Sequence, residues 1–249
     1  MKRTIQLTIL AGIGLFAAVG MLHAQVPGVN ITVGQAKTPE EMATSLQIII
    51  LLTVLTLAPA IVIMTTSFTR LIIVLAFLRQ ALGTQQSPPN QILIGLALFL
   101  TFFIMEPVWS DIHTNAYKPY MERRLTQEQA LDRSAVPIKR FMQQFVRDKD
   151  LGLFIKIAKI PRPRSIQEVP FHVLVPAFII SELKTAFQIG FLIYLPFLVV
   201  DLVVSSVLMS MGMMMLPPIM ISLPLKLMLF VLVDGWNLIV SSMVESFFQ

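Results

Sequence analysis

The stretch PAFIISELKTAFQIGFLIYLPFLVVDLVVSSVL, residues 176–208, is almost wholly apolar and decides the class of fold. It is longer than the roughly 20 apolar residues that one helix needs to cross a bilayer, so it predicts one long helix or a bent pair. Glu182, Lys184 and Asp201 interrupt it. A charge at the bilayer centre costs at least about 2.5–3.5 kcal/mol on insertion scales, so each should face protein, water or an opposite charge.

The rest of the chain is also typical of a membrane protein. Of its 249 residues, 55% are hydrophobic and 13% are charged, with a mean hydropathy of +0.77, whereas soluble domains usually carry about 25% charged residues. Further apolar runs occupy residues 46–64, 71–78, 91–103 and 216–244, and Pro59 predicts a kink in the first. We therefore expect an all-α integral membrane protein of long, bent apolar helical hairpins plus a small polar helical domain.

Residues 108–170 form that polar domain. Apolar residues recur at roughly helical spacing through PIKRFMQQFVRDKDLGLFIKIAK (137–159), which predicts amphipathic helices, and PRPRS (161–165) ends the segment. Between residues 111 and 168 there are 12 Lys and Arg against 7 Asp and Glu, a surplus that equals the net charge of +5 of the whole chain. The basic balance therefore belongs to this segment and does not indicate nucleic-acid binding.

The first 24 residues have the layout of a cleavable signal peptide. Lys2 and Arg3 precede an apolar run, and the small residue Ala24 ends it; the alternative is an uncleaved first membrane helix. With cleavage, Arg70 and Arg79 lie in the cytoplasm and the polar domain is periplasmic. Simple charge counting would place that domain inside, but the positive-inside rule applies to short loops.

The charges within the apolar runs allow several interpretations. Glu182 and Lys184 are two residues apart and cannot share one helix face. For Glu182 and Lys226, deep in long apolar runs, we favour a salt bridge between helices or subunits. Asp201 and Asp234 are equally well explained by an interfacial position, and a proton relay in a transporter is a third interpretation.

No catalytic or metal-binding pattern is present in the sequence. The chain has no cysteine and only 3 histidines. One of these, His23, lies in the signal segment, whereas His113 and His172 have no ligand at metal-binding spacing. Zinc-protease, nucleophile-elbow, phosphate-loop and dinucleotide motifs are all missing. We therefore expect no enzyme activity, no metal and no cofactor.

The stretch PAFIISELKTAFQIGF (176–191) resembles the signature of the FliP family of flagellar export proteins, with Pro-Ala-Phe, Ser-Glu-Leu and then Gly-Phe. A second block, MGMMMLPPIMISLPLKLMLFVLVDGW (211–236), and a third, TSFTRLIIVLAFLRQALGTQQSPPNQIL (66–93), follow the same family. The resemblance covers nearly the whole chain. The signal and extended start are closer to the flagellar protein than to its injectisome relative SctR.

This resemblance implies a pore-forming core subunit of the flagellar type III secretion export gate. Five copies would assemble with FliQ and FliR, and would associate with FlhA and FlhB. Unfolded flagellar export substrates would pass through the pore across the bacterial inner membrane, at the flagellar basal body. The implied organisation is a signal (1–24), a tail with a first apolar hairpin (25–107), the periplasmic polar domain (108–170), and a second apolar hairpin with a gate loop (171–249).

By the same resemblance, Met213, Met214 and Met215 in MSMGMMMLPP (209–218) form a gasket around the pore. Methionine is unbranched and flexible, so it repacks around varied surfaces, and an apolar constriction excludes ions by dewetting. Periodicity alone would make these residues core filler, but three consecutive methionines cannot all share one helix face.

The resemblance also assigns roles to residues around this loop. Gly212, Pro217 and Pro218 act as the loop hinge, since glycine frees the backbone and proline limits where a helix can start. Glu182 and Lys226 form a salt bridge between subunits. The competing interpretation is a small ion- or solute-coupled transporter with a relay of Glu182, Lys184 and Asp201, although no paired inverted repeat is evident.

Overall fold

The computed structural model describes residues 39–84, 86–161, 163, 165, 168–213 and 216–248. The predicted signal peptide and most of the tail after it lie outside these residues. Over the described ranges the regular structure is helical and contains no strand. Two helices are long and apolar enough to cross a membrane, or up to four spans if each bent helix pair is one span. The prediction of an all-α integral membrane protein is confirmed.

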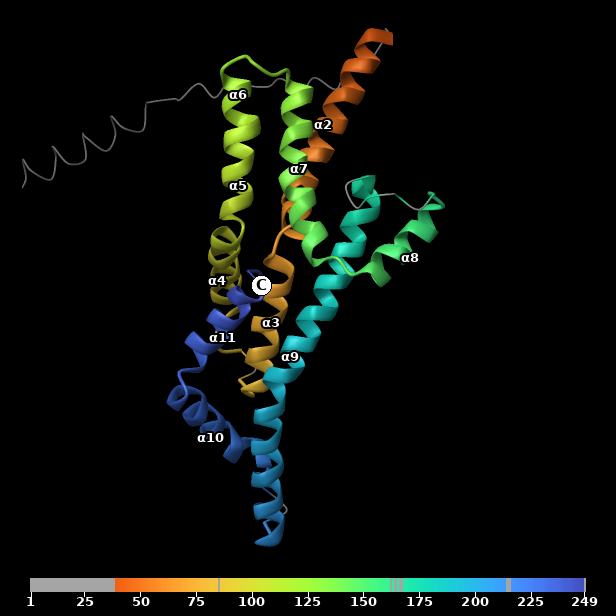
Figure 1. Ribbon diagram of the computed structural model, residues 1–249. Coiled ribbons are helices and arrows are strands. Elements are labelled where there is room, and N and C mark those ends of the chain that lie inside the picture. Colours follow the sequence, from red (N-terminus) through yellow and green to blue (C-terminus); the bar gives the residue numbers. More distant parts are fainter. Residues whose placement is uncertain are drawn as a thin grey trace, which may run out of the picture. The chain divides into compact units, whose positions relative to one another are not determined.

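Figure 1 shows the helices of the described chain. In order they are α2 (Pro39–Met64), α3 (Phe68–Ala81), α4 (Asn90–Ile104), α5 (Glu106–Ile112), the π-helix η1 (His113–Tyr117), α6 (Lys118–Met121), α7 (Gln127–Phe145), α8 (Asp148–Ala158), α9 (Phe171–Ser210), α10 (Pro218–Leu232) and α11 (Gly235–Glu245).

The chain divides into two compact units, with the boundary inside α2 after Val54. In the first unit the described part of α2 exposes apolar side chains, and the Thr53 hydroxyl donates a hydrogen bond to the Ile49 carbonyl within the helix. The second unit, residues 55–249, contains the remaining helices and the buried core. Pro59 lies inside α2, as the sequence predicts.

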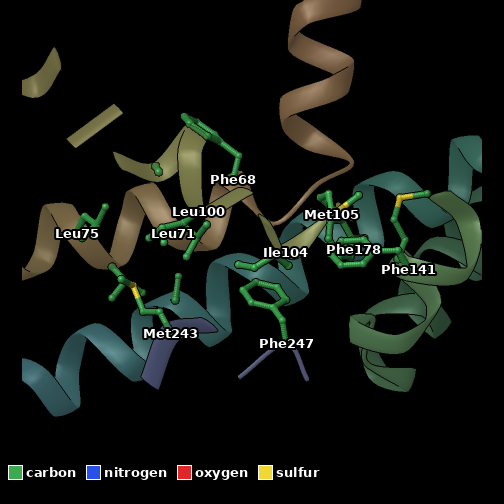
Figure 2. Close-up of a cluster of buried hydrophobic side chains, with 14 of the residues drawn as sticks. Phe68, Leu71, Leu75, Leu100, Ile104, Met105, Phe141, Phe178, Met243 and Phe247 are labelled. Carbon is green, nitrogen blue, oxygen red and sulfur yellow. The ribbon is translucent and has the colours of Figure 1, made fainter. Parts of the chain in front are cut away.

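The core of the second unit is the contact between α3 and α9. The α3 residues Leu71, Val74, Leu75 and Leu78 are fully buried, and their i, i+3, i+4, i+7 spacing places them on one helix face. On α9, Phe178 is also fully buried, and Figure 2 shows it next to Met105 and Phe141. This apolar seam brings α3 and α9 together.

Two pairs of consecutive helices are bent at the short break between them. α4 and the α5–α6 segment meet at 55°, and α10 and α11 meet at 65°. The second bend occurs at Asp234, whose φ of 50° is left-handed. A Cβ on Gly235 would lie 2.3 Å from the Phe230 ring, so only glycine fits at this turn. Residues 216–244 therefore form a bent pair of helices and not one continuous helix.

The polar residues 108–170 form short helices, and α7 and α8 both pack against α9. α7 begins with a capping box, in which Thr126 and Gln129 satisfy each other's backbone N–H groups. Phe141 on its apolar face is buried against Phe178 of α9, with ring centroids 6.0 Å apart. This segment belongs to the same compact unit as the apolar helices.

We expect Gly190→Ala to destabilise the contact between α3 and α9. A Cβ at Gly190 would lie 2.7 Å from the Phe77 ring, and overpacking of this kind typically costs about 1–3 kcal/mol. Gly95→Ala is the matched control, because nothing lies within 4 Å of its added Cβ and alanine is favoured over glycine in a helix by about 1 kcal/mol. The measurement is the midpoint of thermal unfolding in detergent, and equal midpoints would contradict this packing.

Candidate functional site

The loop between α9 and α10 begins with a fixed turn at the end of α9. The N–H of Met213 donates to the Leu208 carbonyl at 3.0 Å, and that of Gly212 donates to the Met209 carbonyl at 3.1 Å. Gly212 has φ of 75°. These bonds form a Schellman motif, in which a left-handed glycine satisfies the last carbonyls of the helix. Gly212 therefore ends α9 in a defined conformation.

The far end of the loop is set by proline. Pro217 precedes α10, and Pro218 is its first residue, a position where the missing N–H costs nothing. Between these two ends Met211 and Leu216 are exposed, with 65% and 45% of their surface accessible. Met213 is half-buried, and Met214 and Met215 lie outside the described residues. Of the predicted gasket, Met213 is therefore the described residue, and it directly follows the turn at Gly212.

The predicted bridge residue Glu182 is completely buried on α9 and is paired with Arg70 of α3. Nε of Arg70 donates to Oε2 of Glu182 at 2.9 Å, and Nη2 donates to Oε1 at 2.5 Å. Arg70 is 4% exposed. Two parallel charge-assisted hydrogen bonds are the strongest form of this pair, and they neutralise a carboxylate that the apolar surroundings would otherwise destabilise.

The remaining N–H groups and faces of Arg70 bind the C-terminal end of the chain. Nη1 donates to the hydroxyl of Ser246 at 3.0 Å and to its carbonyl at 3.3 Å. The guanidinium lies 3.8 Å from the centre of the Phe247 ring and 5.2 Å from that of Phe145 on α7, which are cation–π distances. One arginine thus joins α3, α7, α9 and the segment after α11.

Ser181, next to Glu182 on α9, holds the corner between α7 and α8. Its hydroxyl accepts a hydrogen bond from the N–H of Arg147 at 3.0 Å and donates to Oδ2 of Asp150 at 2.8 Å. The Arg147 guanidinium also donates to the Ser181 carbonyl at 3.3 Å. Within the Ser-Glu-Leu motif, the serine therefore fixes the polar segment and the glutamate fixes α3.

The second predicted bridge residue, Lys226 of α10, is 3% exposed and binds a different carboxylate. Its Nζ lies 2.6 Å from Oδ2 of Asp201 on α9 and 3.2 Å from the carbonyl of Ala81 at the end of α3. Within one chain Glu182 and Lys226 therefore have separate partners. A salt bridge between them across subunits stays a prediction.

Sequence reasoning missed the role of Arg70, which we expected only to lie in the cytoplasm. In the structure Arg70 lies inside α3, and its charge neutralises Glu182. The cytoplasmic position itself stays a prediction. A signal was available, since a lone arginine within an apolar run is costly and needs a partner. The prediction that Glu182 and Lys184 occupy different faces is confirmed, because Glu182 is buried and Lys184 is exposed.

The transporter relay is not assembled in the described chain. Glu182 binds Arg70, and Asp201 binds Lys226. The two carboxylates are 19 positions apart on one continuous helix, α9. At 1.5 Å per residue this separation is about 28 Å along the helix axis. No proton can pass directly over that distance. Over the same residues no group of acidic or histidine side chains is placed to hold a metal ion.

These features define a class of protein. It is an integral membrane protein in which buried ion pairs join the apolar helices, and a methionine-rich segment connects the last long helix to the bent pair after it. The family model described as the FliP family matches residues 51–243, most of the chain. The chain belongs to the FliP family.

Three curated relatives match over almost their whole length. A flagellar biosynthetic protein FliP from Bacillus subtilis is 55% identical over 87% of this chain and 98% of the relative. Those from Pectobacterium carotovorum and Caulobacter vibrioides are 51% and 50% identical, over 95% and 99% of this chain and 92% of each relative. The chain is therefore a flagellar biosynthetic membrane protein.

We expect Arg70→Met to lower the free energy of unfolding by about 3–5 kcal/mol, because it leaves Glu182 buried without a counter-ion. The double variant Arg70→Met/Glu182→Leu should be more stable than Arg70→Met alone, since it removes the stranded charge. Stability in detergent is measured by denaturant or thermal unfolding.

Arg140→Met is the control for this experiment. Arg140 pairs with Asp111 at 3.3 Å but is 65% exposed, and exposed pairs contribute only about 0–1 kcal/mol. If Arg70→Met were no more destabilising than Arg140→Met, the buried pair of Arg70 and Glu182 would not be what holds α3 against α9.

Proposed function

We propose that this protein is a pore-forming core subunit of the flagellar type III secretion export gate, through which unfolded flagellar proteins cross the bacterial inner membrane. The observation that carries the proposal is the short apolar loop of residues 211–217, held by a Schellman turn at one end and by Pro217-Pro218 at the other. The turn at Gly212 and the two prolines fix the two ends of the loop, and unbranched methionine side chains are suited to repacking around varied surfaces.

The exposed apolar surfaces support assembly into a larger complex. Phe187, Phe191 and Leu192 on α9 each expose more than half of their surface. An apolar groove of about 440 Å³ runs between α9 and α10, lined by residues such as Val203 and Leu229. Surfaces of this kind need lipid or protein to cover them.

The partners and the topology are part of the same proposal. Five copies form the pore together with FliQ and FliR, and the complex associates with FlhA and FlhB at the flagellar basal body. The polar residues 108–170 lie on the periplasmic side. The methionines of the five copies meet around the axis and close the pore to ions when no substrate is present.

We expect Met213→Ala/Met214→Ala/Met215→Ala to increase the conductance of small ions through the gate. Alanine removes the flexible side chains that fill the constriction, but it leaves the turn at Gly212 and the prolines unchanged. Conductance is measured in cells or proteoliposomes containing the gate co-purified with its FliQ- and FliR-like subunits.

The control is Met64→Ala/Met121→Ala, which changes exposed methionines outside the loop and outside the groove between α9 and α10 and should leave conductance as it was. An unchanged leak in the triple variant would argue against the gasket. Saturable uptake of a solute by this chain alone in liposomes would favour the transporter instead.

The predicted bridge between subunits is tested by charge exchange. If Glu182 and Lys226 pair across subunits, Glu182→Lys and Lys226→Glu each impair assembly, and the double variant partly restores it. The pairs within the chain predict the opposite result. A lysine at position 182 would face Arg70, and a glutamate at position 226 would face Asp201, so the double variant would be no better than either single one. Native mass spectrometry of the purified complex measures the assembled fraction.

A further inference from the structure

α9 and α10 are antiparallel neighbours whose contacts share one register. Phe197 of α9 packs against Phe230 of α10, with ring centroids 6.4 Å apart. Four residues further along α9, Asp201 binds Lys226, which lies four residues earlier on α10. Equal steps in opposite directions define a single alignment of the two helices, because residues four apart lie on the same helix face. The next pair in this alignment is Ser205 with Ser222, and it leads directly to the loop.

Lys226 makes the polar contacts that hold this alignment. Among the described residues of α10, it alone forms a side-chain hydrogen bond or ion pair with another helix. The groove between the two helices is lined by apolar residues alone, such as Val203 and Leu229. Apolar contacts tolerate sliding, whereas an ammonium that is 3% exposed must keep its acceptors.

The third member of this contact is the end of α3. Nζ of Lys226 lies 3.2 Å from the carbonyl of Ala81, the last residue of α3. The final carbonyls of a helix have no partner within it and carry a partial negative charge, so a cation is favourable there. Gly83 follows in a left-handed turn, with φ of 78°. A Cβ added at Gly83 would lie only 4.0 Å from Nζ of Lys226. Lys226 thus ties the α9–α10 hairpin to α3.

Alternative alignments would break both contacts. A slip of one helical turn, about 5.4 Å, would place Lys226 opposite Phe197 or Ser205 instead of Asp201. Neither side chain can neutralise the ammonium, and the carbonyl of Ala81 would be out of reach as well. Leaving a buried charge without its partner is strongly unfavourable, so the contact selects one register against its neighbours.

We propose that Asp201 and Lys226, together with the Ala81 carbonyl, are the positioning residues of the methionine-rich loop. Asp201 lies nine residues before the end of α9, and Lys226 lies eight residues after the start of α10. The two helix segments between this contact and the loop are therefore about 12–14 Å long. Fixing the register of α9 against α10 at this contact fixes the position of the loop along the axis of α9. The role in positioning the loop for gating rests on the function proposed above; the register itself does not.

The register is tested by cross-linking cysteines in the full chain, expressed in a flagellated host with its partner proteins. The natural chain contains no cysteine, so Ser205→Cys/Ser222→Cys introduces the only thiols of this subunit. A short bis-methanethiosulfonate reagent should join them, and mass spectrometry of the linked peptides gives the yield. Ser206→Cys/Ser222→Cys is the off-register pair, because Ser206 is exposed on another face of α9, and it should give little product.

We expect Lys226→Met to lower the ratio of on-register to off-register product several-fold. Lys184→Met removes the same charge from exposed α9 surface and should leave the ratio unchanged. If Lys226→Met fails to accumulate in the membrane, Asp201→Asn is measured instead, since it keeps the size of the side chain and weakens the same contact. A ratio that stays at the level of the unsubstituted background overturns the proposal, whereas a general loss of stability would lower both products together.

A second measurement separates this proposal from the proposed function. Small-ion conductance of the gate should rise in Lys226→Met, as it should in the methionine variant, because the loops of neighbouring subunits no longer meet at one height. A lower cross-linking ratio with unchanged conductance supports the register and argues against the gating loop. An unchanged ratio argues against the register, whatever the conductance.

Discussion

The buried pair of Arg70 and Glu182 is the interaction on which the rest of the structure depends. A carboxylate with no exposed surface can stay charged among apolar helices only with a partner that neutralises it and satisfies its oxygens. Arg70 does both with a bidentate contact, and its remaining groups reach Ser246 and two phenylalanine rings. The packing of α3 against α9 and the position of the C-terminal end are thereby fixed by one guanidinium group.

α9 is largely apolar, and its polar contacts with other helices lie at two places along its length. Near its start, Ser181 and Glu182 bind the α7–α8 corner and α3, respectively. Far along the same helix, Asp201 binds Lys226 of α10, which also binds the end of α3. Apolar packing provides most of the driving force but little directional selectivity. The ion pairs supply that selectivity, so one long helix serves as the common reference for the polar segment, the first hairpin and the loop.

Most of the helices could be predicted from the sequence, because the length of an apolar run and the positions of proline and glycine act locally. Residues 171–210 form one long helix, which is one of the two alternatives that the sequence left open. Gly212 ends that helix and Pro217 precedes the next one, as their residue types favour. The partners of the buried charges could not be predicted. Glu182 could have paired with any cation in the chain or in a neighbouring subunit, and Arg70, 112 positions away, gives no sign of this in its spacing.

The sequence by itself determined an all-α membrane protein of the FliP family, with a methionine-rich loop between two apolar helices. These conclusions depend on composition, local backbone preferences and motifs that need no partner. Only the tertiary structure decided that Arg70 neutralises Glu182, that Lys226 binds Asp201, and that residues 216–244 bend at Asp234. The physical reason is that a buried charge is stabilised by whichever opposite charge the packing of apolar surfaces brings within hydrogen-bonding distance. Apolar packing is non-directional, so the sequence does not indicate which charges it brings together.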